Sequence, residues 1–387
     1  MDYSKDLSFE QSHRFVEFRA ENSTYANGDG IAEINVDIPL SSGEYLDMED
    51  ARLVFDLAIT ADGTGGDTYP YSASSWMERF SVRAHNQTEI GNQTNNYNRY
   101  VRLQKEMKNS TDNEACWDAV LEGASAITQA ANVVSTFERA HKPLVNIFSH
   151  DGYYPAWAHK GFQIRIDLSD VSLLGANVLS YTITNLRYEC RLVKLKPEAH
   201  NATLKQLDSP EGIIFDFSST EAVLKTIDTS TSVVYQFGRV SNRLKRVEVV
   251  EYTTGDHGNF QRNNITSYRY RLGSEYSTST SIDVSAVKIA RHVLHYMRAH
   301  KVSVDEMKLY GNAANTATLL ASTRFVMANQ MDLSKQDEVI SSADSKGMDL
   351  EIHLTRSATA TAGTAYLFKN EDRRLQILSG AQLQMLS

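Results

Sequence analysis

Apolar and polar residues alternate through residues 161–196, and this pattern constrains the fold more than any other feature of the sequence. One run has as its apolar members Phe162, Ile164, Ile166 and Leu168. A second run has Leu186, Tyr188, Cys190 and Leu192. A period of two places all apolar side chains of a run on one side, so each run predicts a strand with one packed face and one wet face.

A polar joint, residues 196–212, interrupts this pattern. It contains Pro197, Pro210 and Gly212, and strand signals resume at Ile213-Ile214-Phe215. We interpret the joint as the connection between two β-sandwiches. The predicted domains are residues 1–200, a first jelly roll with an N-terminal arm, and residues 201–387, a second jelly roll. A chain of 387 residues is long enough for two domains of about 200 residues each.

Short strand signals recur in both halves. The first half has them at 15–18, 34–38, 53–59, 80–82 and 145–148, besides the two runs above. The second half has them at 213–217, 233–237, 247–250, 268–272, 325–327, 350–354, 366–368 and 375–378. The residues before Arg14 are expected to form an arm anchored by Phe9. Roughly eight strands per half with long connections predict an all-β fold, two tandem eight-stranded jelly-roll β-sandwiches.

One inserted helix is expected in each half. In the first half a helical stripe is formed by Tyr97, Tyr100, Val101, Leu103 and Met107. In the second half the same spacing relates Val287, Ala290, Leu294 and Met297, with Asp283 as the expected N-cap. Residues 118–139 are rich in Ala, Ser and Thr, and either a helix or a long loop is compatible with them.

The charge balance bears on possible partners. A net charge of −9 argues against a broad nucleic-acid-binding surface, which requires clustered Lys and Arg. The tight basic cluster of Arg243, Lys245 and Arg246 has Glu248 and Glu251 beside it, so we interpret it as a subunit contact or a solvated edge. The first residues do not resemble a signal peptide, and no apolar run reaches membrane-span length, so synthesis and folding in a cytoplasm are expected.

The sequence contains no motif that predicts catalysis. There is no Gly-x-Ser-x-Gly elbow and no Gly-x-x-x-x-Gly-Lys loop, so we predict no enzyme activity and no catalytic or cofactor-binding residue. A β-sandwich glycosidase with dispersed carboxylates is a remote alternative. The two cysteines, Cys116 and Cys190, are too few for a disulfide framework, and Cys190 is predicted to be a core residue.

Two places in the sequence carry residue types that ligate metals, and neither predicts a metal site. His292 and His295 lie three residues apart on the expected helix, but no further zinc ligands accompany them, so an exposed or half-packed pair is preferred. Asp62 and Asp67 flank the Gly-rich loop at 63–66, whose spacing fits no EF-hand; a solvated, flexible turn is expected there.

The aromatic segment Tyr153-Tyr154-Pro155-Ala156-Trp157 has two interpretations. Aromatic platforms stack sugars or bases, which would suit a receptor- or carbohydrate-binding spike built from two sandwiches. The segment also directly precedes a predicted core strand, and structural packing is therefore the preferred interpretation.

Several segments together resemble double jelly-roll major capsid proteins of the tectivirus–adenovirus lineage. In the first half these are Trp76-Met77-Glu78-Arg79-Phe80-Ser81-Val82-Arg83, Asn96-Tyr97-Asn98-Arg99-Tyr100, and the segments 143–155, 162–166 and 181–186. In the second half Tyr268-Arg269-Tyr270-Arg271-Leu272-Gly273-Ser274-Glu275-Tyr276, with 345–350 and 375–380, is similar to the Polinton and virophage branch. The chain departs from that branch at 277–282, where a Pro-containing turn is usual.

The resemblance implies a viral structural protein of a DNA virus, with no cofactor and no metal. It implies a homotrimer whose six similar rolls form a pseudo-hexameric capsomer that tiles an icosahedral virion, assembled in the host cytoplasm or nucleus. The implied partners are copies of itself, neighbouring capsomers, minor capsid or penton proteins, and an internal membrane. Because the N-terminal arm is not basic, tight nucleic-acid binding is not expected.

Overall fold

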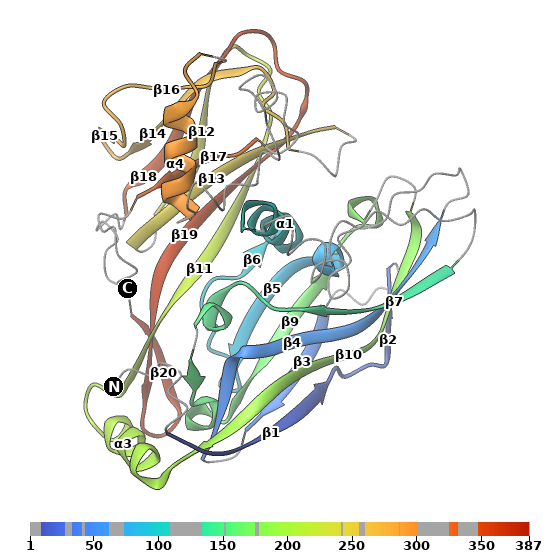
Figure 1. Ribbon diagram of the computed structural model, residues 1–387, viewed down its shortest axis with the longest axis vertical. Helices are drawn as coiled ribbons and strands as arrows, with labels where there is room; N and C mark the ends of the chain where they lie inside the picture. Colours follow the sequence, from blue (N-terminus) through green and yellow to red (C-terminus); the bar gives the residue numbers. More distant parts are fainter. Residues whose placement is uncertain are drawn as a thin grey trace. The chain divides into compact units, whose positions relative to one another are not determined.

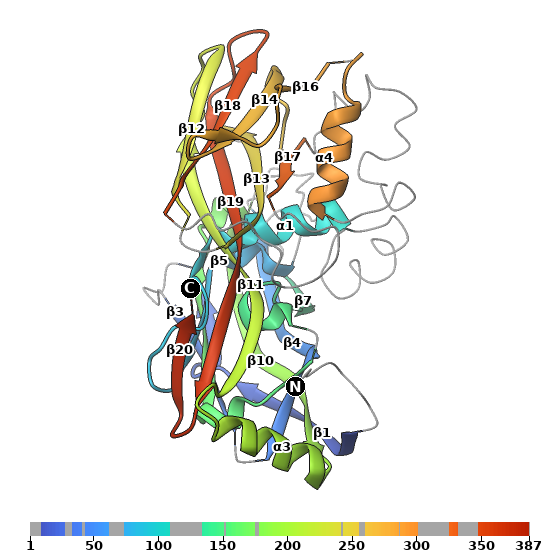
Figure 2. The same cartoon turned by 90° about the vertical axis from the view of Figure 1, so that its left-hand side faces the viewer.

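The computed structural model describes residues 9–27, 33–40, 43–61, 73–108, 134–150, 152–174, 178–240, 243–254, 260–285, 287–300, 325–331 and 347–386 (Figures 1 and 2). The chain divides into two compact units, and each is considered by itself. Unit 1 comprises residues 1–98, 118–220 and 373–387, and unit 2 comprises residues 99–117 and 221–372.

The first roll consists of two antiparallel sheets. Its eight main strands are β1 (Glu10–Arg19), β3 (Glu33–Pro39), β4 (Glu44–Ala61), β5 (Met77–Ala84), β6 (Thr94–Asn95), β7 (Val134–His141), β9 (Gly161–Leu168) and β10 (Val178–Leu195). One sheet has the order β1-β10-β4-β7 and the other β3-β9-β5-β6; β2 (Thr24–Ala26) pairs with β10, and β8 (Tyr153–Tyr154) pairs with β4. The rings of Phe162 on β9 and Tyr188 on β10 meet in the core, 6.3 Å apart.

The second roll repeats this plan. Its main strands are β11 (Ile213–Thr226), β12 (Ser232–Arg239), β13 (Arg243–Thr253), β14 (Ile265–Leu272), β15 (Glu275–Tyr276), β17 (Met327–Gln330), β18 (Asp349–Arg356) and β19 (Gly363–Leu378). The sheets are β11-β19-β13-β17 and β12-β18-β14-β15; β16 (Ile282–Asp283) pairs with β14, and β20 (Gln382–Leu386) with β19. Residues 213–220 of β11 and 373–378 of β19 belong to unit 1.

The two rolls have identical wiring. When the eight main strands of each roll are counted in chain order, one sheet contains strands 1, 8, 3 and 6 and the other contains strands 2, 7, 4 and 5. This is the order of a jelly roll, in which sequence neighbours cross between two sheets. The predicted fold class, two tandem eight-stranded jelly rolls, is confirmed.

Each roll has its inserted helix between strands 5 and 6. These helices are α1 (Tyr97–Lys108) and α4 (Ala290–His300). A further helix, α3 (Pro197–Leu207), occupies the segment that the sequence pattern presented only as a polar joint. Pro197 suits its first turn, where a missing N–H costs nothing, and Ala199, Thr203 and Leu207 form its buried side at a spacing of four.

The expected position and buried face of the second helix are wrong. Asp283 is not an N-cap, because it pairs with Ser267 in the β16–β14 ladder, and the helix begins seven residues later at Ala290. Its buried side chains are His292, Tyr296, Ala299 and His300, whereas Val287 is 91% exposed and Leu294 is 47% exposed. The imidazole of His292 can be buried in the core because it forms a hydrogen bond with the Tyr268 hydroxyl inside the roll.

Four further expectations are corrected. The arm from Glu10 onwards is part of β1, because residues 10–19 pair along β10, and Phe9 is 48% exposed and anchors nothing in the core. Segment 145–148 contains a short 3-10 helix rather than a strand, since Asn146 has a φ of 57°. Residues 134–139 are a strand, and segments 366–368 and 375–378 are one strand, β19. The loop at 62–67, Cys116 and residues 118–133 lie outside the described residues.

Gly161, at the start of β9, is a position that only glycine suits. Its φ is +93°, and a Cβ there would overlap the carbonyl oxygen of Ile38 on the paired strand β3. We expect Gly161→Ala to lower the free energy of unfolding by about 3 kcal/mol or more. Gly43→Ala is the matched control: its φ is +90°, but the space around it is open, so only backbone strain of about 1–2 kcal/mol is expected. Equal losses in urea titrations of the two variants would refute the overlap.

Candidate interaction surface

Among the described residues, possible metal ligands and nucleophiles are the first candidates for a functional site. No group of three or more His, Cys, Asp or Glu side chains in that part of the chain is arranged to hold a metal ion. Cys190 is buried, as predicted, and burial raises the pKa of its thiol to about 12. The thiolate needed for nucleophilic chemistry is therefore scarce at neutral pH.

The two histidines of α4 face different surroundings. His292 is fully buried, shares a hydrogen bond of 3.0 Å with the Tyr268 hydroxyl, and stacks on Phe325. Burial lowers its pKa to about 3. His295 is half-buried, with its Nδ1 2.8 Å from Oδ1 of Asn329. The half-packed interpretation thus holds for His295, whereas His292 is a core residue.

The aromatic segment before β9 is packed. Tyr153 and Tyr154 are buried, and Trp157 is half-buried with its ring edge against Tyr45, 6.0 Å between centroids. The Tyr154 hydroxyl lies 2.8 Å from Nε2 of His159. These contacts agree with the packing interpretation and leave no open platform of several rings for a sugar or a base.

The basic cluster before β13 is also partly internal. Arg246 is not on a solvated edge: its Nε lies 3.1 Å from the fully buried carboxylate of Glu248. Burial favours a neutral Glu248, but the charges of Arg246 and His300 outweigh it and lower the carboxyl pKa to about 2. Lys245 pairs with Asp372 at 3.4 Å. The interpretation as a solvated edge is therefore wrong for Arg246, whereas Lys245 keeps a part-exposed side chain, and the alternative of a subunit contact stays a prediction.

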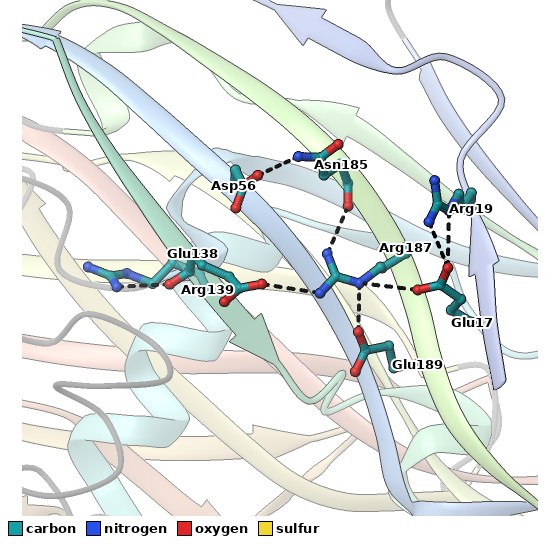
Figure 3. A network of polar contacts seen from close by, with 8 residues as sticks. All are labelled: Glu17, Arg19, Asp56, Glu138, Arg139, Asn185, Arg187 and Glu189. Carbon is teal, nitrogen blue, oxygen red and sulfur yellow. Dashed lines mark hydrogen bonds and ion pairs between the residues drawn. The ribbon is translucent and has the colours of Figure 1, made fainter. Parts of the chain in front are cut away.

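The wet face of the sheet β1-β10-β4-β7 carries a network of charged and polar side chains (Figure 3). We call it the outer sheet face. It includes Glu17 and Arg19 on β1, Asp56 on β4, Glu138 on β7, and Asn185, Arg187 and Glu189 on β10; Arg139, also drawn, lies on the other side of β7 and donates to the backbone carbonyl of Glu138. On β10, alternation places Arg187 and Glu189 on this wet face and Tyr188 and Cys190 on the buried face.

Arg187 lies at the centre of this network. Its guanidinium is 2.6 Å from Oε1 of Glu189, 3.1 Å from Oε1 of Glu138 and 3.7 Å from Oε2 of Glu17 (Figure 3). Partial burial would lower the pKa of Arg187, but its hydrogen bonds to Glu189 and Glu138 outweigh this and raise it. Next to it, Asn185 donates to Asp56 at 2.6 Å. One arginine therefore holds together carboxylates from three strands.

An apolar residue lies beside these charges. Phe15 on β1 is 74% exposed and, with Glu17, Arg52 and Glu189, lines a shallow groove of about 520 Å³. An exposed aromatic ring within a field of both charge signs is typical of a surface that contacts another macromolecule.

The network contributes little to folding. Exposed ion pairs are worth about 0–1 kcal/mol each, and salt screens them. We expect Arg187→Ala to lower the free energy of unfolding by about 1 kcal/mol, because the remaining carboxylates repel one another only through water. Salt at about 0.5 M should close most of this gap. Lys205→Ala, on the exposed side of α3, is the control; a salt-independent loss of several kcal/mol for Arg187→Ala would contradict the assignment.

Sequence alternation predicted that Arg187 and Glu189 face water, but not their partners. Glu17 is brought to Glu189 by the β1–β10 ladder, across more than 170 positions of sequence. Glu138 is brought close by the β4–β7 ladder, in which it pairs with Asp56. No local pattern carries that register.

In the part of the chain that the structure describes, no helix has the length and apolarity needed to span a bilayer.

Two jelly rolls of identical wiring, joined in tandem, define the class of double jelly-roll proteins. The comparisons with solved structures give the same class. The chain is similar to the PBCV-1 virus capsid, with a TM-score of 0.62, 10% sequence identity, and coverage of 97% of each chain. It is similar to the Faustovirus major capsid protein, with a TM-score of 0.62 and 7% identity over 97% of this chain and 92% of that one. It also matches the mavirus major capsid protein, with a TM-score of 0.54 and 11% identity over 98% and 90%.

These likenesses show that the chain has the double jelly-roll fold of viral major capsid proteins. At these identities only the fold is shared, and no site residue is transferred. No family model matches the sequence, and no curated protein does.

Proposed function

We propose that this chain is a viral major capsid protein that forms homotrimers of pseudo-hexameric outline, and that these trimers tile an icosahedral shell. The observation that carries the proposal is the correspondence with the PBCV-1 virus capsid over 97% of both chains.

Symmetry supports the trimer. Three copies that each contain two rolls of the same wiring supply six similar blocks, and a closed threefold ring of such copies approximates a hexagon. Hexagonal blocks fill a plane without gaps, and fivefold vertices formed by the proposed penton proteins would close such a plane into an icosahedral shell.

The surface chemistry is compatible with repeated self-contact. The outer sheet face presents carboxylates and arginines together, so opposite charges are available on two copies that approach each other. Neighbouring capsomers, minor capsid or penton proteins and an internal membrane are further proposed partners, and the proposed location is the virion. We also propose a boundary between the two rolls at residues 200/201, because the last strand of the first roll ends at Leu195 and the first strand of the second roll begins at Ile213.

Sedimentation of the purified full-length chain tests the proposal. We expect a stable species of three times 43.4 kDa that persists on dilution to about micromolar concentration, as an obligate interface permits. Higher-order assemblies should form as concentration rises. A chain that sediments as a 43.4 kDa monomer at every concentration would refute it.

A further inference from the structure

A surface pocket of about 400 Å³ lies in unit 2, between α4 and the segment that follows β15. One wall is formed by the hydroxyl residues Ser277, Thr278 and Ser279, and the other by Arg291, His295 and Arg298 of α4. The α4 residues have a spacing of four and three, which places them on one side of the helix. Leu294 of α4 completes the lining, so the pocket combines hydrogen-bond donors and positive charge with one apolar side chain.

The hydroxyl wall is held in place by Arg269. Its guanidinium donates to the carbonyl oxygens of Thr278 at 2.8 Å and Ser279 at 3.1 Å, and lies over the Tyr276 ring at 3.7 Å. These two carbonyls, which would repel an anion, are thereby already bonded. On the opposite wall, Arg291 donates to Oγ1 of Thr280 at 2.5 Å, which ties the helix to the same segment.

Several donors in the pocket are unused. Within the described residues, the Arg298 guanidinium and the hydroxyls of Ser277 and Ser279 have no hydrogen-bond partner. Neither Arg291 nor Arg298 has a carboxylate partner there. This differs from Arg271 and Arg356 of the same unit, which pair with Glu351 and Glu251.

The pKa of His295 also reflects the positive charge in the pocket. Burial is the main cause of the lowered pKa of His295, and the charges of Arg298 and Arg291 lower it further. Among the described residues, no acidic side chain lines the pocket to offset them.

We propose that this pocket binds one tetrahedral oxyanion, a phosphate or sulfate group, either as the free ion or as an ester on a larger molecule. Arginine binds such groups through two parallel N–H donors, and serine hydroxyls supply the remaining contacts. The inference is separate from the proposed function, because the pocket is lined by one unit of one chain and does not require assembly.

The test uses isothermal titration of the full-length protein with sodium phosphate and sodium sulfate, against sodium chloride at matched ionic strength. Because the pocket is open to solvent, we expect a Kd of about 1 mM for either oxyanion and no saturable heat for chloride. Arg298→Gln and Arg291→Gln should each weaken binding about tenfold or more. Arg239→Gln is the matched control, since Arg239 is an exposed arginine of the same unit, and it should bind as the wild type does.

Two further arms identify the source of the oxyanion. A sulfated oligosaccharide and a phosphorylated monosaccharide are titrated in the same way. If one ester binds at least tenfold more tightly than the inorganic ions, and Arg298→Gln abolishes this extra affinity, the ligand is an ester. If the esters and the inorganic ions bind with equal affinity, the ligand is the free ion. Saturable binding of chloride, wild-type affinity in both arginine variants that remain folded by thermal melting, or equal loss in Arg239→Gln would overturn the proposal.

Discussion

Replacing Glu251 with alanine is expected to lower the free energy of unfolding by about 3–5 kcal/mol, because it leaves a buried arginine without its counter-charge. Both Glu251 and Arg356 are fully buried, and they form two hydrogen bonds of 2.6 and 3.1 Å. The Tyr235 hydroxyl and the Asn263 amide complete the network, each donating to Glu251 at 3.0 Å. Both carboxylate oxygens of Glu251 are thus hydrogen-bonded. When Glu251 is removed, the free energy cost of burying the Arg356 charge is no longer offset.

A double variant separates a buried charge from lost packing. Glu251→Met combined with Arg356→Met removes both charges, so its loss in urea or thermal unfolding should be smaller than that of Glu251→Ala. Glu351→Ala is the matched control, because Glu351 pairs with the part-exposed Arg271 at 3.4 Å and should cost about 1 kcal/mol or less. A Glu251→Ala protein as stable as the Glu351→Ala protein would contradict the assignment.

Acid is expected to destabilise the folded chain strongly between about pH 6.5 and pH 4, because two histidines are buried in neutral form. Burial lowers the pKa of His159 to about 4, despite its hydrogen bond to the carbonyl of Gly161, and that of His292 to about 3. In the unfolded chain both take up a proton near pH 6.5. The unfolded state therefore binds more protons in this window, and stability falls as pH falls, by roughly 3 kcal/mol per histidine at pH 4.

The carboxylate of Glu248 adds to this loss in stronger acid. Its pKa of about 2 is below the ordinary value of 4.5, so its contribution is present above pH 4.5 and is lost as pH falls towards 2. Urea titrations at several pH values measure the combined slope. His292→Asn, which retains an amide group near Tyr268 but no titration, should roughly halve the slope above pH 4.5. A pH-independent stability, or an unchanged slope in His292→Asn, would contradict this account.

Strands with one buried and one solvent-exposed face could be predicted from sequence, because their alternation of apolar and polar residues follows directly from which side chains are buried. In β9, Phe162, Ile164 and Ile166 are fully buried, as their alternation predicted. The face of α4 could not be predicted in this way. Its buried positions are filled by histidine and tyrosine, whose partners come from strands distant in sequence, while Leu294 is exposed.

The candidate surfaces show the same division. The outward direction of Arg187 follows from period two, but its ring of carboxylates follows from the register of three strands. Similarly, nothing local relates Ser277 to Arg298, because the pocket arises only when the roll places the 277–279 segment beside α4. Local pattern thus predicted most of the strands and the presence of α1, whereas tertiary pairing determined the buried face of α4 and the sites.

Electron microscopy of the purified chain tests the central claim most directly, since it shows both the number of copies and the number of rolls. Two-dimensional averages should show a threefold particle with six lobes, two from each chain, which pack side by side into hexagonal sheets or closed shells. Single particles with two lobes, or rings without threefold symmetry, would contradict the account.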